Sequence, residues 1–204
     1  MKKGWGQNFL VDQTVVEDLI QAAQISKGDL VLEVGAGEGV VTKALAGKAG
    51  KIIAVEIDPD LIPKLRLNLR GLGNVEIINA DILTLDIDKA GLAFISRRSI
   101  KVVGSIPYQI TSPLIHKLLK LKNRPKSITF IVQKEVGEKI AARTPKATYL
   151  SNFVANFAEA KIIRTVKPGA FHPAPKVDSA ILQINLYPRP KTSDPTSFEA
   201  FLHR

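Results

Sequence analysis

The sequence predicts an α/β fold with a doubly wound, mostly parallel sheet and an antiparallel strand near the C-terminal edge of that sheet. From residue 30 to residue 142, short apolar runs alternate with segments in which apolar residues recur at helical spacing. The first of these runs ends abruptly in three closely spaced glycines, Gly35, Gly37 and Gly39. The last run of the chain, at residues 180–186, alternates apolar and polar side chains in part, which is typical of an antiparallel strand.

The individual elements follow from these patterns in chain order. Strands are expected at residues 30–34, 52–56, 75–78, 100–104, 127–133 and 180–186. A helix from Val15 to Ala23, with Asp12 as its N-cap, precedes the first strand. Further helices are expected at residues 39–47, 59–70, 112–121, 134–142 and 150–158. Pro59 suits the first turn of its helix, and residues 193–204 indicate a short helix after a linker.

Composition indicates one main domain with a substantial core, because 45% of the 204 residues are apolar. No apolar run reaches the roughly 18 residues of a membrane span, and the N-terminus lacks the apolar segment of a secretory signal. The chain has no cysteine, and its three histidines lack metal-ligand spacing. We therefore expect a cytoplasmic monomer with no bound metal and no membrane contact.

The net charge of +10 is distributed unevenly along the chain. Residues 89–146 hold 13 basic residues but only two acidic ones, Glu135 and Glu138. This asymmetry favours a nucleic-acid partner, because phosphates attract clustered Lys and Arg side chains. The alternative interpretation is an ordinary solvated helix face. The residues expected to contact nucleic acid are Lys117, Lys120, Lys122 and Arg124.

The glycine turn and two acidic residues predict a site for a nucleotide-like cofactor. Glycines let the backbone approach a ligand closely, because no Cβ stands in the way. The third glycine falls one residue earlier than in the dinucleotide motif G-x-G-x-x-G, and the sequence contains no P-loop motif. Glu56 ends the second strand, where a carboxylate can accept from both ribose hydroxyls, and Asp81 follows the third strand. This order resembles that of S-adenosylmethionine-dependent methyltransferases; the alternative is a structural turn with ordinary surface acids.

Three further motifs make the resemblance specific. They are residues 6–10, GQNFL, residues 104–108, GSIPY, and residues 171–180, FHPAPKVDSA. Together with residues 33–37 and 79–81, they are similar to the motifs of the rRNA adenine N6,N6-dimethyltransferase family. The resemblance covers residues 4–188. It implies a Rossmann-like methyltransferase fold, S-adenosylmethionine as the cofactor, and dimethylation of two adjacent adenines near the 3′ end of small-subunit rRNA.

The resemblance also implies a domain boundary and roles for individual residues. Residues 1–188 are the expected catalytic domain, and residues 189–204 a linker and the start of a truncated helical domain. Tyr108 and Phe171 are expected to hold the flipped target adenine between two aromatic faces. The residues implied to act on the adenine are Ser105, Ile106, Pro107 and Tyr108. Those implied to bind S-adenosylmethionine are Gln7, Asn8, Leu10, Gly35, Gly37, Glu56, Ile57, Asp81, Ile82 and Ser105.

Position 105 departs from the family pattern. The usual residue is Asn, within Asn-Leu/Ile-Pro-Tyr, whereas this chain has the shorter Ser105. The Ser105 hydroxyl can accept a hydrogen bond from the adenine N6 directly or through a water, or its presence can mark a weakened enzyme. Two functions other than methylation of small-subunit rRNA remain open from the sequence. One is an adenine methyltransferase for large-subunit rRNA, and the other is a non-catalytic RNA-binding or ribosome-assembly protein.

Overall fold

The computed structural model describes residues 7–87 and 100–192. Its centre is a seven-stranded sheet with the strand order β4-β3-β2-β5-β6-β9-β7. Gly6 and the helix expected at residues 193–204 lie outside the described residues. The strands are β2 (Leu30–Val34), β3 (Lys51–Glu56), β4 (Val75–Asn79), β5 (Ile100–Ser105), β6 (Ser127–Gln133), β7 (Ala158–Val166) and β9 (Ser179–Leu186).

The sheet is parallel from β4 to β6, and β9 runs antiparallel between β6 and β7. The predicted mostly parallel sheet with an antiparallel strand near its C-terminal edge is therefore confirmed. The strand order reverses between β2 and β5, where Val34 lies opposite Gly104. Open α/β sheets bind ligands beyond the carboxyl ends of the strands at such a reversal, so this edge is the expected place of a site.

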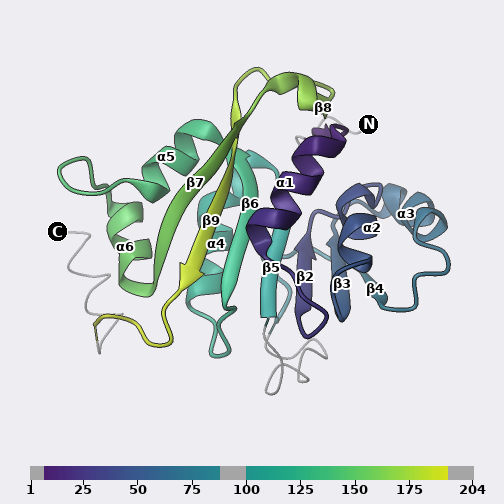
Figure 1. Ribbon diagram of the computed structural model, residues 1–204, viewed down its shortest axis with the longest axis horizontal. Helices are drawn as coiled ribbons and strands as arrows, with labels where there is room; N and C mark the ends of the chain where they lie inside the picture. The colour runs from purple at the N-terminus through teal and green to yellow at the C-terminus, as the bar shows by residue number, and fades with distance from the viewer. Residues whose placement is uncertain (1–6, 88–99, 193–204) are drawn as a thin grey trace.

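Helices cover both faces of the sheet (Figure 1). On one face lie α1 (Gln13–Ala23), α2 (Val40–Ala46) and α3 (Ile62–Asn68), and on the other lie α4 (Thr111–Leu119), α5 (Lys134–Ala141) and α6 (Tyr149–Phe157). The central strands β2, β3, β5 and β6 are buried from both sides, and Ile128 and Phe130 of β6 are fully inaccessible to solvent. None of the helices in the described part of the chain is long and apolar enough to cross a membrane.

Two local predictions about helices have different outcomes. Asp12 caps α1 as expected, because its carboxylate accepts from the backbone N–H groups of Thr14 and Val15. The single helix expected at residues 59–70 is wrong in detail. It is divided into a 3-10 turn, η1 (Pro59–Leu61), and α3, because Pro63 lacks an N–H and fits only the first turn of a new helix.

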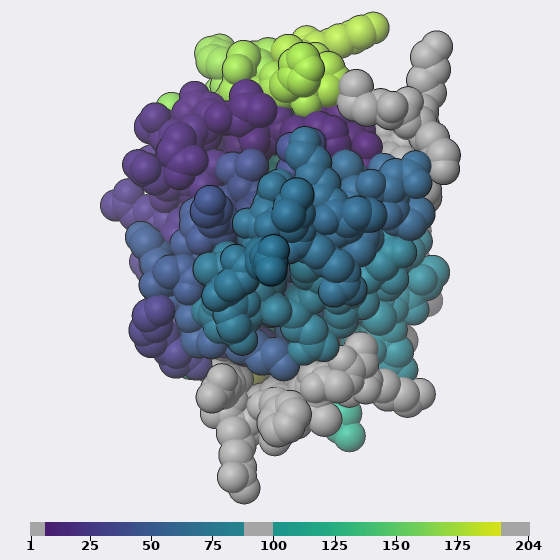
Figure 2. Space-filling model, turned by 90° about the vertical axis from the view of Figure 1, so that its right-hand side faces the viewer, coloured from purple at the N-terminus to yellow at the C-terminus, as the bar shows by residue number. Residues whose placement is uncertain are grey.

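Three strands of the structure were not predicted from the sequence. The edge strand β7 follows α6 directly and contains a bulge between Ile162 and Arg164, which breaks the alternation that marks a strand. The other two, β1 (Phe9–Leu10) and β8 (Phe171–His172), form a separate two-stranded sheet. In Figure 2 the yellow-green segment around β8 lies on the purple N-terminal segment, above the blue face of α2 and α3. This small sheet brings the N-terminal segment and the segment after β7 together at the carboxyl edge of the main sheet.

Candidate active site

A cavity of about 330 Å³ lies at the carboxyl edge of the sheet, around the reversal between β2 and β5. Its walls come from the segments that follow β2, β3, β4 and β5, together with β1 and β8. The volume falls within the range of small-molecule sites. All residues that the sequence assigned to the cofactor and to the adenine line it: Gln7, Asn8, Leu10, Gly35, Gly37, Glu56, Ile57, Asp81, Ile82, Ser105, Ile106, Pro107, Tyr108 and Phe171.

The floor of the cavity is the glycine turn after β2. Gly35 has a φ of 75°, in the left-handed region, and a Cβ on it would lie 3.2 Å from the carbonyl oxygen of Ser105. A Cβ on Gly37, whose φ is 57°, would lie 3.3 Å from the ring of Phe9. Because neither glycine has a Cβ, the glycine turn can lie close to β1 and to the end of β5. The turn therefore lines the cavity with backbone that carries no side chain at two positions, as close contact with a nucleotide-like group requires.

Glu56 is the acidic residue at the end of β3, and its side chain is almost fully buried. One carboxylate oxygen accepts from the backbone N–H of Gly37 at 2.8 Å, and the other accepts from Asp58 at 2.9 Å. A carboxylate offers about four lone-pair directions, so two remain for hydroxyl donors in the cavity. Asp58 in turn accepts from the side chain of Gln7 at 3.1 Å, which ties the N-terminal segment to this wall.

Asp81 begins a turn after β4 that lines the cavity next to Glu56. Its side chain accepts from the backbone N–H of Leu83 at 2.8 Å, and its backbone carbonyl accepts from Leu85 at 2.9 Å. Lys117 of α4 completes this turn, since its ammonium donates to the carbonyls of residues 82, 83 and 85 at 2.9, 2.8 and 2.6 Å. Burial lowers the pKa of Lys117, although Asp81 and Asp86 raise it.

The structure therefore places Lys117 differently from the prediction that it contacts nucleic acid. Its three donors are all engaged by backbone carbonyls. Arg124 also has a local role, because it donates to the carbonyl of Pro188 at 3.2 Å and lies 5.9 Å from the ring centre of Phe157. Lys120 lies 5.7 Å from the ring centre of Phe153, and Lys122 is exposed. Lys117 and Arg124 therefore make local contacts in this structure, and their contact with RNA stays a prediction.

The end of the basic segment, residues 120–126, lies far from the cavity. Lys126 donates its backbone N–H to Ile100, at the amino ends of β5 and β6, whereas the cavity lies at their carboxyl ends. With six residues in β5, these two edges are about 20 Å apart. Helix α4 explains the displacement, because it begins beside the cavity at Thr111 and runs back along the sheet. Residues 120–126, where basic side chains are densest, thus belong to a surface separate from the cavity.

Another side of the cavity, next to the glycine turn, is formed by the end of β5. Ser105 is half-buried, and a Cβ on the preceding Gly104 would lie 2.3 Å from the carbonyl oxygen of Val34. The two strands are therefore in close contact where the two halves of the site meet. Tyr108 begins the 3-10 turn η3 (Tyr108–Ile110), and its hydroxyl lies 2.7 Å from that of Ser179. Phe171 of β8 is buried and lines the same cavity.

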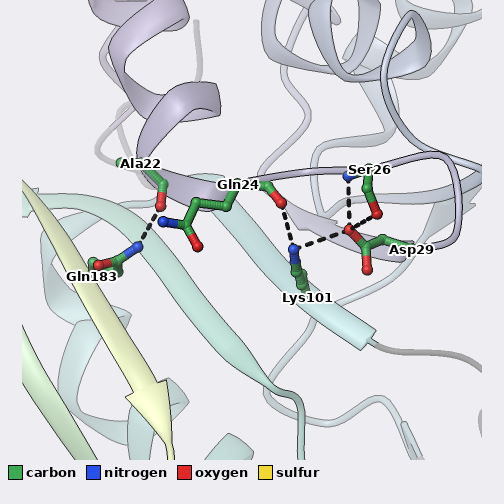
Figure 3. A network of polar contacts seen from close by, with 6 residues as sticks. All are labelled: Ala22, Gln24, Ser26, Asp29, Lys101 and Gln183. Atoms are coloured by element: carbon green, nitrogen blue, oxygen red, sulfur yellow. Dashed lines mark hydrogen bonds and ion pairs between the residues drawn. The ribbon is translucent and has the colours of Figure 1, made fainter.

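Glu33 and Asp29 are buried acidic residues outside the cavity lining. Burial, together with the charge of the nearby Glu56, raises the pKa of Glu33 on β2 to about 8, while Thr42 acts in the opposite direction. Within the described residues, one carboxylate oxygen of Glu33 has no hydrogen-bond partner. Asp29 lies at the amino edge of the sheet (Figure 3), where Lys101 and Ser26 bond it at 3.0 and 2.8 Å. Despite burial, these hydrogen bonds lower the pKa of Asp29.

The sequence analysis missed three contacts at this site. Phe9 packs beside Gly37, Ser179 meets Tyr108, and Lys117 holds the turn after Asp81. Phe9 and Ser179 do lie within motifs that the sequence analysis singled out, but the motifs alone gave them no role. Among residues 7–87 and 100–192, no group of three or more His, Cys, Asp or Glu could hold a metal ion.

Comparisons with known proteins add to this geometry. The model of a family described as ribosomal RNA adenine dimethylase matches residues 1–204. A protein of Alkaliphilus oremlandii named ribosomal RNA small subunit methyltransferase A is 39% identical over 193 residues, which cover 94% of this chain and 67% of that protein. One of the same name from Clostridium botulinum strain Loch Maree is 42% identical over 93% of this chain and 68% of its own length. The chain thus spans about two thirds of these relatives.

Two solved structures are also similar. The 23S rRNA methyltransferase ErmE superposes with a TM-score of 0.83 and is 30% identical, with 96% of this chain and 78% of that chain covered. A dimethyladenosine transferase from Plasmodium falciparum gives a TM-score of 0.78 at 29% identity, with coverages of 88% and 63%.

Proposed function

The chain belongs to the ribosomal RNA adenine dimethylase family, and on that premise we propose that it methylates N6 of two adjacent adenines in small-subunit rRNA. The observation that carries the proposal is the single cavity that joins two sets of residues. Gly35, Glu56 and Asp81 lie on one side of it, and residues 105–108 lie on the other. The small-subunit target is inferred from the relatives named for that activity.

The cofactor half of the cavity fits S-adenosylmethionine. Glu56 retains acceptor capacity for ribose hydroxyls, and the buried Ile82 offers an apolar surface to an adenine ring. The two glycines with positive φ leave room beside Phe9 and Ser105. When bound, S-adenosylmethionine supplies a methyl group that is already activated on a sulfonium. We propose that the residues from Gln7 to Leu10 close over its methionine end.

The half of the cavity that takes the target adenine has to promote the reaction of N6, which is a poor nucleophile. The lone pair of the adenine N6 is delocalised into the ring, so the protein must orient the amine and accept its hydrogen bonds. We assign the Ser105 hydroxyl and the Ile106 carbonyl as these acceptors. The bond from N6 to the methyl carbon then forms as the carbon–sulfur bond breaks, and the proton of the amine leaves to solvent. Tyr108 and Phe171 are assigned to stack on the two faces of the base.

We further propose that residues 1–188 form the catalytic domain and that the chain acts as a cytoplasmic monomer on the ribosomal subunit. Two other functions have support from a specific observation. The similarity to ErmE favours large-subunit rRNA as an alternative target, and Ser105 in place of Asn favours a non-catalytic factor.

Incubation with radiolabelled S-adenosylmethionine and unmethylated subunits distinguishes these functions. The proposal expects label in the small-subunit rRNA and background counts in the large subunit. Label in the large subunit alone supports the first alternative. Binding of both S-adenosylmethionine and small subunits without any transfer supports the second.

A further inference from the structure

Tyr108 and Ser179 meet across the site although they are 71 positions apart in sequence. The two hydroxyl oxygens lie 2.7 Å apart, so one hydroxyl donates to the other. Tyr108 comes from the turn after β5, whereas Ser179 is the first residue of β9. The contact therefore joins the parallel part of the sheet to its antiparallel strand at the edge where the cavity lies.

The two partners differ in how firmly the fold holds them. Ser179 is inaccessible to solvent and lies between two strands, opposite Gln133 of β6 and Val166 of β7. The preceding Asp178 is fixed as well, since its backbone carbonyl accepts from Lys134 at 3.0 Å and its side chain accepts from Lys167 at 2.8 Å. The hydroxyl of Ser179 is thus a rigid point of the scaffold.

Tyr108, in contrast, stands in a three-residue 3-10 turn and is half-buried, with its ring at the cavity wall. No side chain caps this turn. The ring can pivot about its χ1 and χ2 bonds unless its far end is held, and a hydrogen bond at the hydroxyl holds that end. The same bond engages the phenol hydroxyl of a residue that lines the cavity.

We propose that Ser179 is a positioning residue that fixes the plane of the Tyr108 ring against the target base. The proposal rests on the proposed function, because a fixed plane matters only if a flat base must be aligned for transfer. Misalignment by a fraction of an ångström at a reacting atom lowers the rate more than it lowers binding. Ser179 touches neither cofactor nor base in this account and acts through Tyr108 alone.

The test is a double-mutant cycle with Ser179→Ala, Tyr108→Phe and both together, measured under single turnover on unmethylated small subunits. Each single variant is expected to lower the transfer rate about three- to tenfold, the range for one lost hydrogen bond. The double variant should be no slower than the slower single one, and the affinity for S-adenosylmethionine should stay unchanged. Ser127→Ala is the matched control, because this buried serine begins the neighbouring strand at its distant end and should leave the rate unchanged.

The proposal would be overturned if the fold reduction in the double variant equals the product of the two single reductions. It would also be overturned if the transfer rate of Ser179→Ala lies within about twofold of the wild-type rate. The same cycle measured by urea unfolding needs no activity. Non-additive losses of stability support the contact between the two hydroxyls, and additive losses contradict it. A wild-type chain that transfers no methyl group would count against the proposed function, while the unfolding cycle would still decide whether Ser179 holds Tyr108.

Discussion

The carboxylate of Glu56 accepts a hydrogen bond from the backbone N–H of Gly37 at 2.8 Å. The contact fixes the end of β3 against the glycine turn that follows β2, so two walls of the cavity are joined by one buried side chain. Glu56 therefore has two tasks in our account. It shapes the turn, and it presents its remaining lone pairs to the ribose of the cofactor.

Glu56→Ala should weaken the binding of S-adenosylmethionine at least tenfold, because the ribose loses a charged acceptor worth about 1.5–3 kcal/mol. Isothermal titration calorimetry measures this directly. Glu76→Ala is the control, since Glu76 lies on β4 with its side chain 51% exposed and paired with Lys51. Unchanged affinity in a folded Glu56→Ala protein would contradict the assignment.

Lys117→Met should also weaken cofactor binding, by about tenfold, although Lys117 is absent from the cavity lining. Three carbonyls of the turn after Asp81 lose their common donor, and the turn becomes free to move. Lys122→Met, an exposed change on the segment after the same helix, should have no effect. A Lys117→Met protein with normal cofactor affinity but weakened RNA binding would restore the original interpretation of this lysine.

Ser105→Asn should raise the single-turnover rate of methyl transfer by up to about 10²-fold, because an Asn amide reaches further toward the amine than a hydroxyl. The affinity for S-adenosylmethionine should stay within a few fold, since the gain belongs to the transition state. Ser105→Ala should lower the rate. Equal rates for all three proteins would show that position 105 has no catalytic role.

Glu33→Gln should change how stability depends on pH. Burial raises the pKa of Glu33 from 4.5 to about 8, so the folded protein keeps a proton that the unfolded chain releases. This contribution to stability is complete below pH 4.5 and is lost as the pH rises toward 8, by up to about 1.4 kcal/mol per pH unit. Urea unfolding at pH 5, 6.5 and 8 should show that the free energy of unfolding of the variant increases relative to that of the wild type at each step. A difference between the two free energies that does not change with pH would contradict the raised pKa.

Changing both Lys120 and Lys122 to Gln should reduce the salt dependence of RNA binding, with the slope of log K against log salt falling by up to about two. The rate of transfer at saturating RNA should not change, because these residues lie at the opposite edge of the sheet from the cavity. Filter binding at several salt concentrations measures the slope. An unaltered slope would remove the basic segment from the RNA-binding surface.

Most of the fold was predictable because its strands are buried on both faces and read as continuous apolar runs. The strand expected at residues 127–133 is β6, with the same bounds. The edge strand β7 was missed because only one of its faces is covered, and its bulge between Ile162 and Arg164 shifts the phase of the alternation. Patterns of period two fail at such irregularities.

The site was predictable only where short motifs resemble those of a family. Those motifs named the residues that line the cavity, but their roles stay predictions until binding and transfer are measured. Contacts made across the fold left no signal in the sequence. Nothing in the sequence near Lys117 indicates which carbonyls it meets, and charge along the chain does not tell at which edge of the sheet Lys122 will lie. Both follow from the direction of α4, which is a tertiary property.

The most direct test of the central claim is nucleoside mass spectrometry of small-subunit rRNA after incubation with the wild-type chain and S-adenosylmethionine. Our account predicts N6,N6-dimethyladenosine at two adjacent adenines near the 3′ end, and its loss in the Glu56→Ala protein. The account is contradicted if the chain binds S-adenosylmethionine and small subunits but leaves every adenine of that rRNA unmethylated.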